Sequence, residues 1–127
     1  MKDAMLKPAE TIAILQKQSD THAYKAGEVI FSAGEMGSVM YGILEGEVEL
    51  LVDGKVVETI NSGDVFGEGA LVHVEHQRNS TAVSKIDCKL AALDQNRFLF
   101  AIENTPMFAV EVMRSYSDRL YRFKHAF

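Results

Sequence analysis

Short runs of β-branched and aromatic residues, separated by glycines, dominate the middle of this 127-residue chain. Runs of this kind are typical of strands, and glycine permits the tight turns between them. The strongest single signal is Asp53-Gly54 between residues 48–52 and 55–60, because this dipeptide favours a two-residue hairpin turn with positive φ. Further strands are predicted at residues 29–31, 39–44, 65–66, 80–84 and 88–93.

The spacing of these runs predicts a fold class. About eight short strands, with turns roughly every 8 to 12 residues, would fill residues 23–94, as they do in a β-sandwich or jelly roll. We therefore expect a mainly β fold with flanking helices, in which an eight-stranded jelly-roll β-barrel forms one domain spanning residues 1–127. The residues before and after this roll, 8–22 and 95–127, are expected to be helical.

Three helices are predicted around the roll. Pro8 suits the first turn of a helix over residues 8–18, and residues 96–102 predict a second short helix. Thr105-Pro106 supplies an N-cap and a first helical residue for a third helix that runs toward the end of the chain. This last helix carries an apolar seam that suits either packing on the roll or pairing with a second copy. The seam consists of Ala109, Met113, Tyr116, Leu120, Phe123 and Phe127.

Composition and charge exclude several classes of protein. The net charge of −5 and the pI near 5.3 argue against a protein that tracks a nucleic-acid backbone, which needs a strongly basic face. No apolar run approaches the roughly 20 residues that a membrane span needs, and Met1–Glu10 does not resemble a signal peptide. We therefore expect a cytoplasmic protein with no membrane partner. Cys88, the single cysteine, is expected to be a buried hydrophobe.

The segment best suited to bind a ligand begins at Gly67-Glu68-Gly69 and includes Arg78, ten residues after Glu68. The glycines allow the backbone to approach a ligand, and Arg78 offers a planar, permanently charged donor for two phosphate oxygens. Glu68 would repel a phosphate, but it would accept a hydrogen bond from a ribose 2′-hydroxyl. By themselves these residues also fit a plain turn with a solvated glutamate and a surface arginine.

The surrounding sequence favours a ligand-binding site over a plain turn. The stretch Phe66-Gly67-Glu68-Gly69-Ala70-Leu71 with Arg78 resembles the phosphate-binding cassette of cyclic-nucleotide-binding domains, a family that includes the bacterial catabolite activator protein and the regulatory subunits of protein kinase A. Residues 27–31, 34–35, 41–46 and 63–64 match the same family, so the resemblance covers roughly residues 23–120.

The resemblance implies a sensor that binds cyclic AMP or cyclic GMP, with no catalysis, cofactor or metal. It assigns the ribose 2′-hydroxyl to Glu68, the cyclic phosphate to Arg78, and further phosphate contacts to the amides of the short cassette helix. The whole expected ligand-binding set is Phe66, Gly67, Glu68, Gly69, Ala70, Arg78, Asn79 and Ser80.

Three residues depart from the family pattern. Gly69 stands where an aliphatic residue is common, and Gln77 stands where proline often precedes the arginine, which suggests a looser cassette. Asn79 stands where many members have alanine, serine or threonine, and its amide suits either a phosphate oxygen or a purine edge. The base is therefore left open between adenine and guanine, with a slight preference for cyclic AMP.

In the family the C-terminal helix closes over the purine and transmits the signal by moving. The resemblance thus makes residues 95–127 hinge and lid helices, with Tyr121, Arg122, Phe123 and Lys124 as candidates for the base lid, since aromatic and guanidinium planes stack on bases. A homodimer or a partner protein is expected to use this helix. No DNA binding is expected, because no helix-turn-helix domain follows Phe127 in this sequence.

Two other functions compete with this interpretation. A cupin-like metal enzyme would use His73, Glu75 and His76, but the sequence has no histidine between Gln77 and Lys124 to complete such a site. The two histidines are instead expected on an exposed loop. An interaction module that has lost its ligand is the other alternative, and the presence of both Glu68 and Arg78 argues against it.

Overall fold

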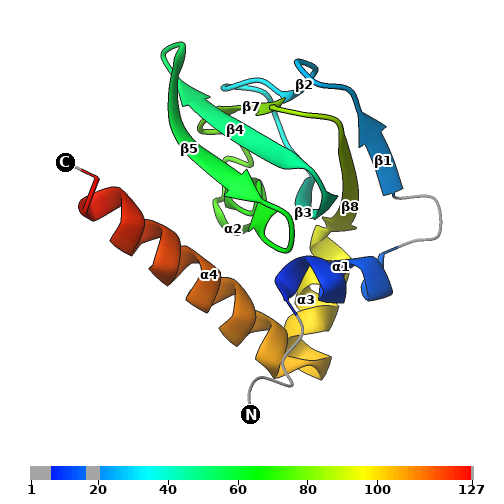
Figure 1. The fold of residues 1–127 in the computed structure, drawn as a ribbon. Helices are drawn as coiled ribbons and strands as arrows, with labels where there is room; N and C mark the ends of the chain where they lie inside the picture. Colours follow the sequence, from blue (N-terminus) through cyan, green and yellow to red (C-terminus); the bar gives the residue numbers. More distant parts are fainter. Residues whose placement is uncertain (1–6, 17–20, 127) are drawn as a thin grey trace.

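The computed structural model describes residues 7–16 and 21–126, which form a β-roll with three longer helices gathered beneath it (Figure 1). Eight antiparallel strands in the described residues form two four-stranded sheets with the orders β1-β8-β3-β6 and β2-β7-β4-β5. The jelly-roll prediction is thus confirmed, although the sheets do not close into a barrel. The strands are β1 (Thr21–Tyr24), β2 (Val29–Phe31), β3 (Val39–Glu45), β4 (Glu47–Val52), β5 (Lys55–Asn61), β6 (Val65–Phe66), β7 (Thr81–Ser84) and β8 (Cys88–Asp94).

The predicted hairpin joins β4 to β5. Asp53 and Gly54 both have positive φ, of 53° and 78°, as a type I′ turn requires. The strands pair from Val52 opposite Lys55 back to Glu47 opposite Asn61, with one register shift after Leu50. This hairpin, which the sequence predicts from two residues, forms the edge of the second sheet.

The start of the roll differs from the prediction. Strand β1 begins at Thr21 and pairs with β8, whereas residues up to 22 were expected to be helical. Helix α1 (Pro8–Leu15) ends three residues before the predicted end, and residues 17 and 18 lie outside the described part of the chain. The sequence Thr-His-Ala-Tyr carries no strong strand pattern because all four residues of β1 are at least partly exposed, so tertiary pairing decides their conformation.

Two apolar clusters form the core. One lies between the two sheets and contains Ile43, Phe66 and Leu90, with Cys88 at its margin as expected for a buried thiol. The other lies between the first sheet and the helices, and it joins Met40 of β3 to Phe98 and Phe108. The second cluster attaches the helices to the roll.

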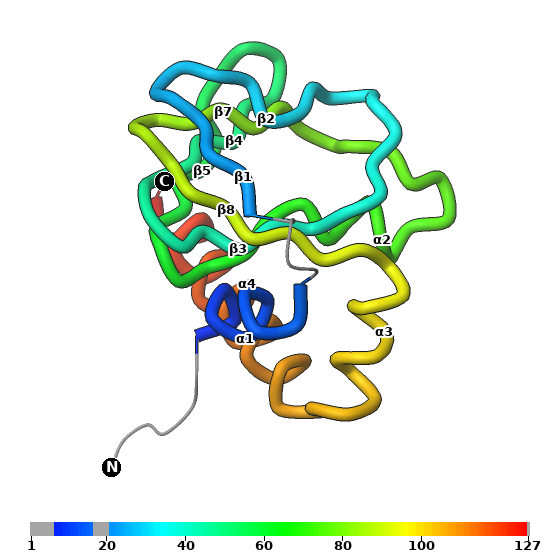
Figure 2. The backbone as a smooth tube through the Cα atoms, turned by 90° about the vertical axis from the view of Figure 1, so that its right-hand side faces the viewer, coloured from blue at the N-terminus to red at the C-terminus, as the bar shows by residue number. Residues whose placement is uncertain are grey.

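The remaining helices are α2 (Gly69–Val72), α3 (Gln95–Asn104) and α4 (Pro106–Lys124). Pro106 opens α4 as predicted, but the Thr105 side chain caps nothing, because the backbone there has φ −138° and ψ 73°. Figure 2 shows α1, α3 and α4 on the same side of the roll. Among the described residues, no helix is long and apolar enough to cross a membrane.

The face that α4 turns to the roll is not the predicted apolar seam. Its buried residues are Phe108, Glu111, Ser115 and Arg119. Met113 and Leu120 of the seam are 64% and 52% exposed, and Phe127 lies outside the described residues. Polar partners on the roll stabilise the buried face, and of the seam Tyr116 packs on the core. Of the two roles left open for the seam, packing on the roll therefore does not account for Met113 and Leu120.

Candidate functional site

A cavity of about 180 Å³ lies where the second sheet, the segment around α2 and the middle of α4 meet. Seven of the eight expected ligand-binding residues line it, and they are Gly67, Glu68, Gly69, Ala70, Arg78, Asn79 and Ser80. Phe66, the eighth, is fully buried and stacks on the Tyr41 ring with centroids 5.3 Å apart. The structure also brings residues to this cavity that the sequence interpretation did not name for it: Phe31, Leu50, Glu58, Gln77, Tyr116 and Arg119.

Arg78 is held in one orientation under the cavity. Its Nη1 donates to the Gly67 carbonyl at 2.7 Å, and its Nη2 donates to the Val39 carbonyl at 2.8 Å. Its guanidinium carbon lies 4.1 Å from the centroid of the Phe31 ring, a cation–π contact. These contacts fix the plane of the guanidinium and use two of its five N–H donors.

The environment of Arg78 makes an anion a favourable neighbour. The residue is only 6% exposed, and its Nε is buried without a hydrogen-bond partner in the described part of the chain. Burial lowers the pKa of the guanidinium, and acidic groups including Glu68 oppose this effect. A buried cation with unused donors is stabilised by an anion that reaches it.

Two glycines make room for this arginine. Gly67 has φ +84°, and a Cβ added there would lie 2.9 Å from Arg78 Nη1. A Cβ on Gly37 would lie 2.4 Å from Arg78 Nε and 2.8 Å from the Cβ of Ala70. The sequence interpretation singled out Gly67 but missed Gly37, because tertiary backbone pairing of residues 34–37 with residues 76–78 brings that segment beside the arginine.

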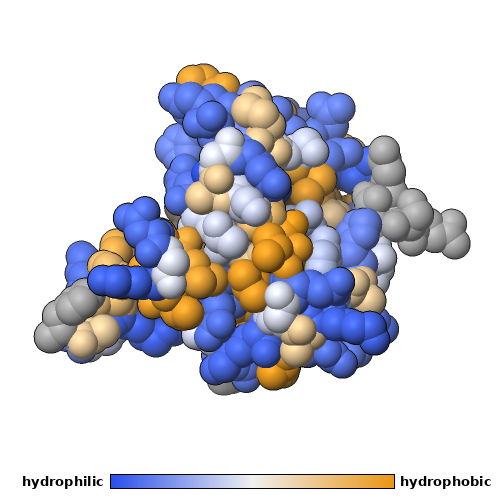
Figure 3. Space-filling view, turned by 90° about the horizontal axis from the view of Figure 1, so that it is seen from above, coloured by the Kyte–Doolittle hydropathy of each residue, from blue (hydrophilic) through white to orange (hydrophobic). Residues whose placement is uncertain are grey.

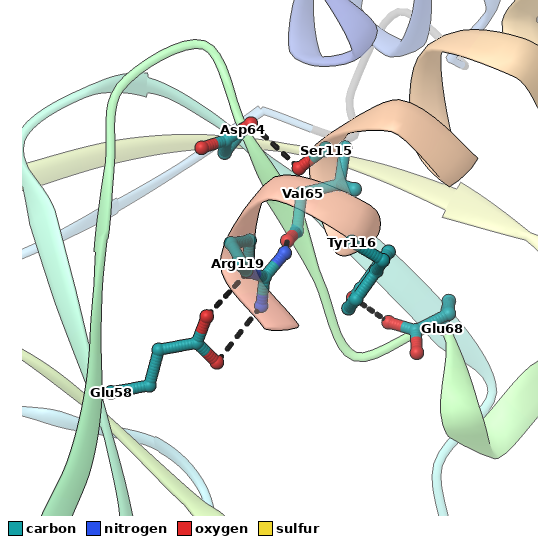
Figure 4. Close-up of polar contacts among 7 residues, drawn as sticks. All are labelled: Glu58, Asp64, Val65, Glu68, Ser115, Tyr116 and Arg119. Atoms are coloured by element: carbon teal, nitrogen blue, oxygen red, sulfur yellow. Dashed lines mark hydrogen bonds and ion pairs between the residues drawn. The ribbon is translucent and has the colours of Figure 1, made fainter. Parts of the chain in front are cut away.

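Glu68 makes a contact that connects the cassette to α4. The Tyr116 hydroxyl donates a hydrogen bond to Glu68 Oε1, and both side chains line the cavity (Figure 4). Burial, with a further contribution from the negative charge of Glu68, raises the pKa of Tyr116 far above its ordinary value. The phenol therefore keeps its proton and is the donor in this pair.

Arg119 fastens α4 one turn further along. Its Nε and Nη2 lie 2.5 and 3.2 Å from the two carboxylate oxygens of Glu58 on β5, and its Nη1 donates to the Val65 carbonyl at 2.6 Å (Figure 4). Burial alone would lower the pKa of Arg119, but the hydrogen bond and charge of Glu58 outweigh it and the pKa is raised. The guanidinium carbon also lies 4.1 Å from the Tyr116 ring centroid.

Ser115 makes a further polar contact between α4 and the roll. Its Oγ donates to Asp64 Oδ1 at 2.8 Å, in the turn before β6 (Figure 4). Ser115, Tyr116 and Arg119 thus all contact the segment from Asp64 to Glu68, and Arg119 also contacts Glu58 on β5. The hydrophobic pattern of the helix includes Tyr116 but passes over Ser115 and Arg119, so it does not predict these polar contacts.

The four lid candidates do not line this cavity. Tyr121 is 62% exposed and stacks on His125 with ring centroids 4.0 Å apart, and Lys124 is also exposed. Arg122 and Phe123 instead line a neighbouring cavity of about 430 Å³ between β5 and α4, which shares Glu58, Tyr116 and Arg119 with the first. In Figure 3, apolar side chains gather between the projecting end of α4 and the body of the molecule.

The histidine loop has a structural role that the sequence did not predict. His73 is exposed as expected, but His76 is partly buried, has φ 56°, and places Nδ1 2.8 Å from the Ala70 carbonyl. This contact ties the loop to the end of α2. Within residues 7–16 and 21–126, no group of three or more histidine, cysteine or acidic residues is arranged to hold a metal ion.

Comparison with known proteins identifies what this arrangement resembles. The family model described as "Cyclic nucleotide-binding domain" matches residues 21–105. The chain is 40% identical over 96 residues to a cAMP-dependent protein kinase regulatory subunit of Schizosaccharomyces pombe, covering 75% of this chain and 22% of the relative. It is 37% identical over 91 residues to a cGMP-dependent protein kinase of Plasmodium berghei, covering 70% of this chain and 10% of the relative.

A solved structure supports the same fold. The catabolite activator protein of Thermus thermophilus superposes with a TM-score of 0.73 at 24% identity, covering 94% of this chain and 56% of that protein. The chain spans less than a quarter of the length of the two kinase-related proteins. The likeness therefore concerns one module of those larger proteins.

Proposed function

This chain belongs to the cyclic nucleotide-binding domain family, and we propose from that premise that it binds cyclic AMP or cyclic GMP and signals by movement of α4. The family is regulatory and not catalytic, so the chain is proposed to be a sensor without enzyme activity. A single domain in the cytoplasm, as the sequence predicts, is part of this proposal.

One observation carries the proposal: Arg78 and Glu68 line the same cavity with opposite charges. A cyclic nucleotide presents an anionic phosphate and, on the same sugar ring, a 2′-hydroxyl that can donate a hydrogen bond. The Gly67 and Val39 carbonyls accept from two of the five N–H donors of Arg78, which leaves donors for the phosphate. Glu68 would accept a hydrogen bond from the 2′-hydroxyl, and a free phosphate has no such sugar hydroxyl.

The other expected ligand-binding residues fit around these two. The N–H groups of Gly69 and Ala70 open α2 and have no acceptor within the helix, so they are available to phosphate oxygens. Asn79 and Ser80 line the cavity close to Arg78 and offer an amide and a hydroxyl. Phe66, which does not line the cavity, would act by supporting the aromatic rings beneath Arg78.

The base is proposed to extend toward the cavity between β5 and α4. That cavity is lined by apolar Val57, Leu120 and Phe123, which suit the faces of a purine. Arg122 and Phe123 would then contribute to the lid, whereas Tyr121 and Lys124 would need α4 to turn or bend before they reached the base. Both purines fit this description, so the choice between adenine and guanine is left to measurement.

The output is proposed to be a shift in the position of α4. A ligand moves an equilibrium only if it binds one state more tightly than the other, and the contacts of α4 with Glu58, Asp64 and Glu68 give it a defined position on the site. A partner protein or a second copy would read this position through the exposed face of α4 that includes Met113.

Isothermal titration with cyclic AMP and cyclic GMP tests the function. We expect saturable binding of at least one nucleotide and a rise in the unfolding temperature that grows with ligand concentration. A 5′-nucleotide with an open phosphate serves as the control ligand. Absence of both heat and thermal stabilisation at millimolar concentrations of either cyclic nucleotide would leave only an interaction module of the same fold.

A further inference from the structure

We propose that the Tyr116 hydroxyl and the ligand's 2′-hydroxyl compete for the carboxylate of Glu68, so that Tyr116 sets the affinity for ribose-containing ligands and couples binding to α4. This inference rests on the proposed function and concerns its regulation. It follows from one contact, the hydrogen bond from Tyr116 to Glu68 Oε1, in the cavity that also contains Arg78 (Figure 4).

Both hydroxyls can serve as the donor to this carboxylate. Each is a single O–H donor, and each would reach Glu68 from the side of the cavity. The ring of Tyr116 is fixed by the Arg119 guanidinium 4.1 Å from its centroid, so its hydroxyl does not rotate away freely. A ribose that bonds to Glu68 at the position of this phenol must displace it.

The position of Tyr116 in the cavity supports displacement over coexistence. The cavity of about 180 Å³ is the part proposed to hold the sugar and phosphate, because the base is proposed to extend into the neighbouring cavity of about 430 Å³. Tyr116 forms part of the wall of the smaller cavity beside Glu68, so a ribose placed against Glu68 meets the Tyr116 hydroxyl. The 2′-hydroxyl would then take over the hydrogen bond that Tyr116 gives up.

The two halves of α4 are attached to the rest of the protein in different ways. Near its start, Phe108 is fully buried and packs edge-on against Phe98, with ring centroids 6.4 Å apart. From Ser115 onward α4 contacts the roll through hydrogen bonds and the partly buried ring of Tyr116, and among the described residues Ser115 and Arg119 are the buried ones there. The first turns thus form an anchor, and a ligand that displaces the Tyr116 hydroxyl would change the contacts of the second half.

The test uses Tyr116→Phe, which keeps the ring and removes only the hydroxyl. In this variant no hydrogen bond from Tyr116 to Glu68 has to be broken when the ligand binds. A ribose ligand should therefore bind about tenfold more tightly. A 2′-deoxy ligand cannot make that bond and should gain nothing. Tyr121→Phe is the matched control, because Tyr121 lies on the same helix but outside the cavity.

The experiment is isothermal titration of the unchanged protein and both variants with cyclic AMP and 2′-deoxy cyclic AMP, repeated with the guanine pair, and thermal unfolding verifies that each variant is folded. We expect the ratio of ribose to deoxyribose affinity to rise about tenfold in Tyr116→Phe and to stay constant in Tyr121→Phe. An unchanged or lower ratio in Tyr116→Phe overturns this inference alone. Failure of the unchanged protein to bind any cyclic nucleotide overturns the proposed function, and this inference with it.

Discussion

The carbonyl oxygen of Gly67 accepts a hydrogen bond of 2.7 Å from Nη1 of Arg78, eleven residues later in the chain. This contact connects the backbone before α2 to the guanidinium that lies over the Phe31 ring. The two parts of the cassette are therefore positioned by each other, and the arginine is oriented before any anion reaches it. Such preorganisation reduces the ordering that binding would otherwise require.

Two replacements of Arg78 should reduce the affinity for cyclic nucleotide to different extents. Arg78→Lys keeps a charge but loses the fork that satisfies the Gly67 and Val39 carbonyls, and Arg78→Ala loses both. We expect titration calorimetry to give a loss of about 1–2 kcal/mol in binding free energy for lysine and about 3 kcal/mol or more for alanine.

The control for this pair is Arg97→Ala, which removes a partly exposed arginine, outside the cavity, whose Nη1 lies 3.6 Å from Asp94. It should leave affinity unchanged. Thermal unfolding of the Arg78 variants separates lost binding from lost folding, since two carbonyls lose their donor. Equal affinities for the Arg78 and Arg97 variants would show that Arg78 does not bind the phosphate.

Gly67→Ala should affect both stability and binding. A residue with φ +84° is strained once it carries a Cβ, which we expect to reduce the free energy of unfolding by about 1–2 kcal/mol. The added Cβ would also lie 2.9 Å from Arg78 Nη1 and push the guanidinium aside. Chemical denaturation and titration calorimetry measure the two effects separately.

Gly27→Ala is a close control, because Gly27 has φ +88° but no atom within 4 Å of the added Cβ. Its stability should fall by a similar amount while its affinity stays the same. If the two alanine variants lost affinity equally, the position of Arg78 would not depend on Gly67.

Removal of the Arg119 side chain should loosen the second half of α4. Arg119→Met keeps much of the apolar stem but leaves Glu58 and the Val65 carbonyl without their donor. We expect a loss of about 2 kcal/mol in the free energy of unfolding, below the usual value for a fully buried ion pair because Glu58 is 29% exposed. Amide exchange should accelerate from Ser115 to Lys124 and not near Phe108.

Lys85→Met provides the comparison. Lys85 Nζ lies 3.5 Å from Glu47, but both side chains are well exposed. Its removal should change stability by no more than about 0.5 kcal/mol. A similar small change for Arg119→Met would mean that the ion pair with Glu58 does not hold the helix.

Glu111 should make stability fall as pH rises. Burial raises the pKa of this carboxyl, which accepts a hydrogen bond from Thr11 Oγ1 at 3.1 Å, and the charge of Glu10 adds to the rise while that of Arg114 opposes it. The folded protein thus binds the proton more tightly than the unfolded chain, in which a glutamate has a pKa of about 4.3. Stability from this group is complete below that pH and is lost as pH rises through the raised folded pKa.

The measurement is urea denaturation between about pH 4 and 7 for the unchanged protein and for Glu111→Gln. The amide keeps an acceptor for Thr11 and removes the titration, so the variant should gain relative stability as pH increases. Glu103→Gln, at an exposed position of α3, should follow the unchanged protein. Parallel curves for the unchanged protein and Glu111→Gln would contradict the prediction.

Local sequence signals predicted most of the fold. The Asp53-Gly54 turn, seven of the eight strands and the start of α4 at Pro106 follow from short-range preferences, and the structure confirms them. Strand β1 was missed because its partly exposed residues adopt their conformation through pairing with β8. The cassette residues were predicted through a family resemblance, and they lie around one cavity except for Phe66.

The sequence by itself determined the order of the elements and the chemistry of the cassette, because turn residues, strand periodicity and the Gly-Glu-Gly pattern act over a few neighbouring positions. The tertiary structure alone decided which face of α4 meets the roll. That rotation depends on partners such as Glu58 and Glu68, which lie 61 and 48 residues away from Arg119 and Tyr116. Contacts over such distances in the chain leave no periodic pattern, so only the folded protein places Tyr116 on the carboxylate that the ligand is proposed to need.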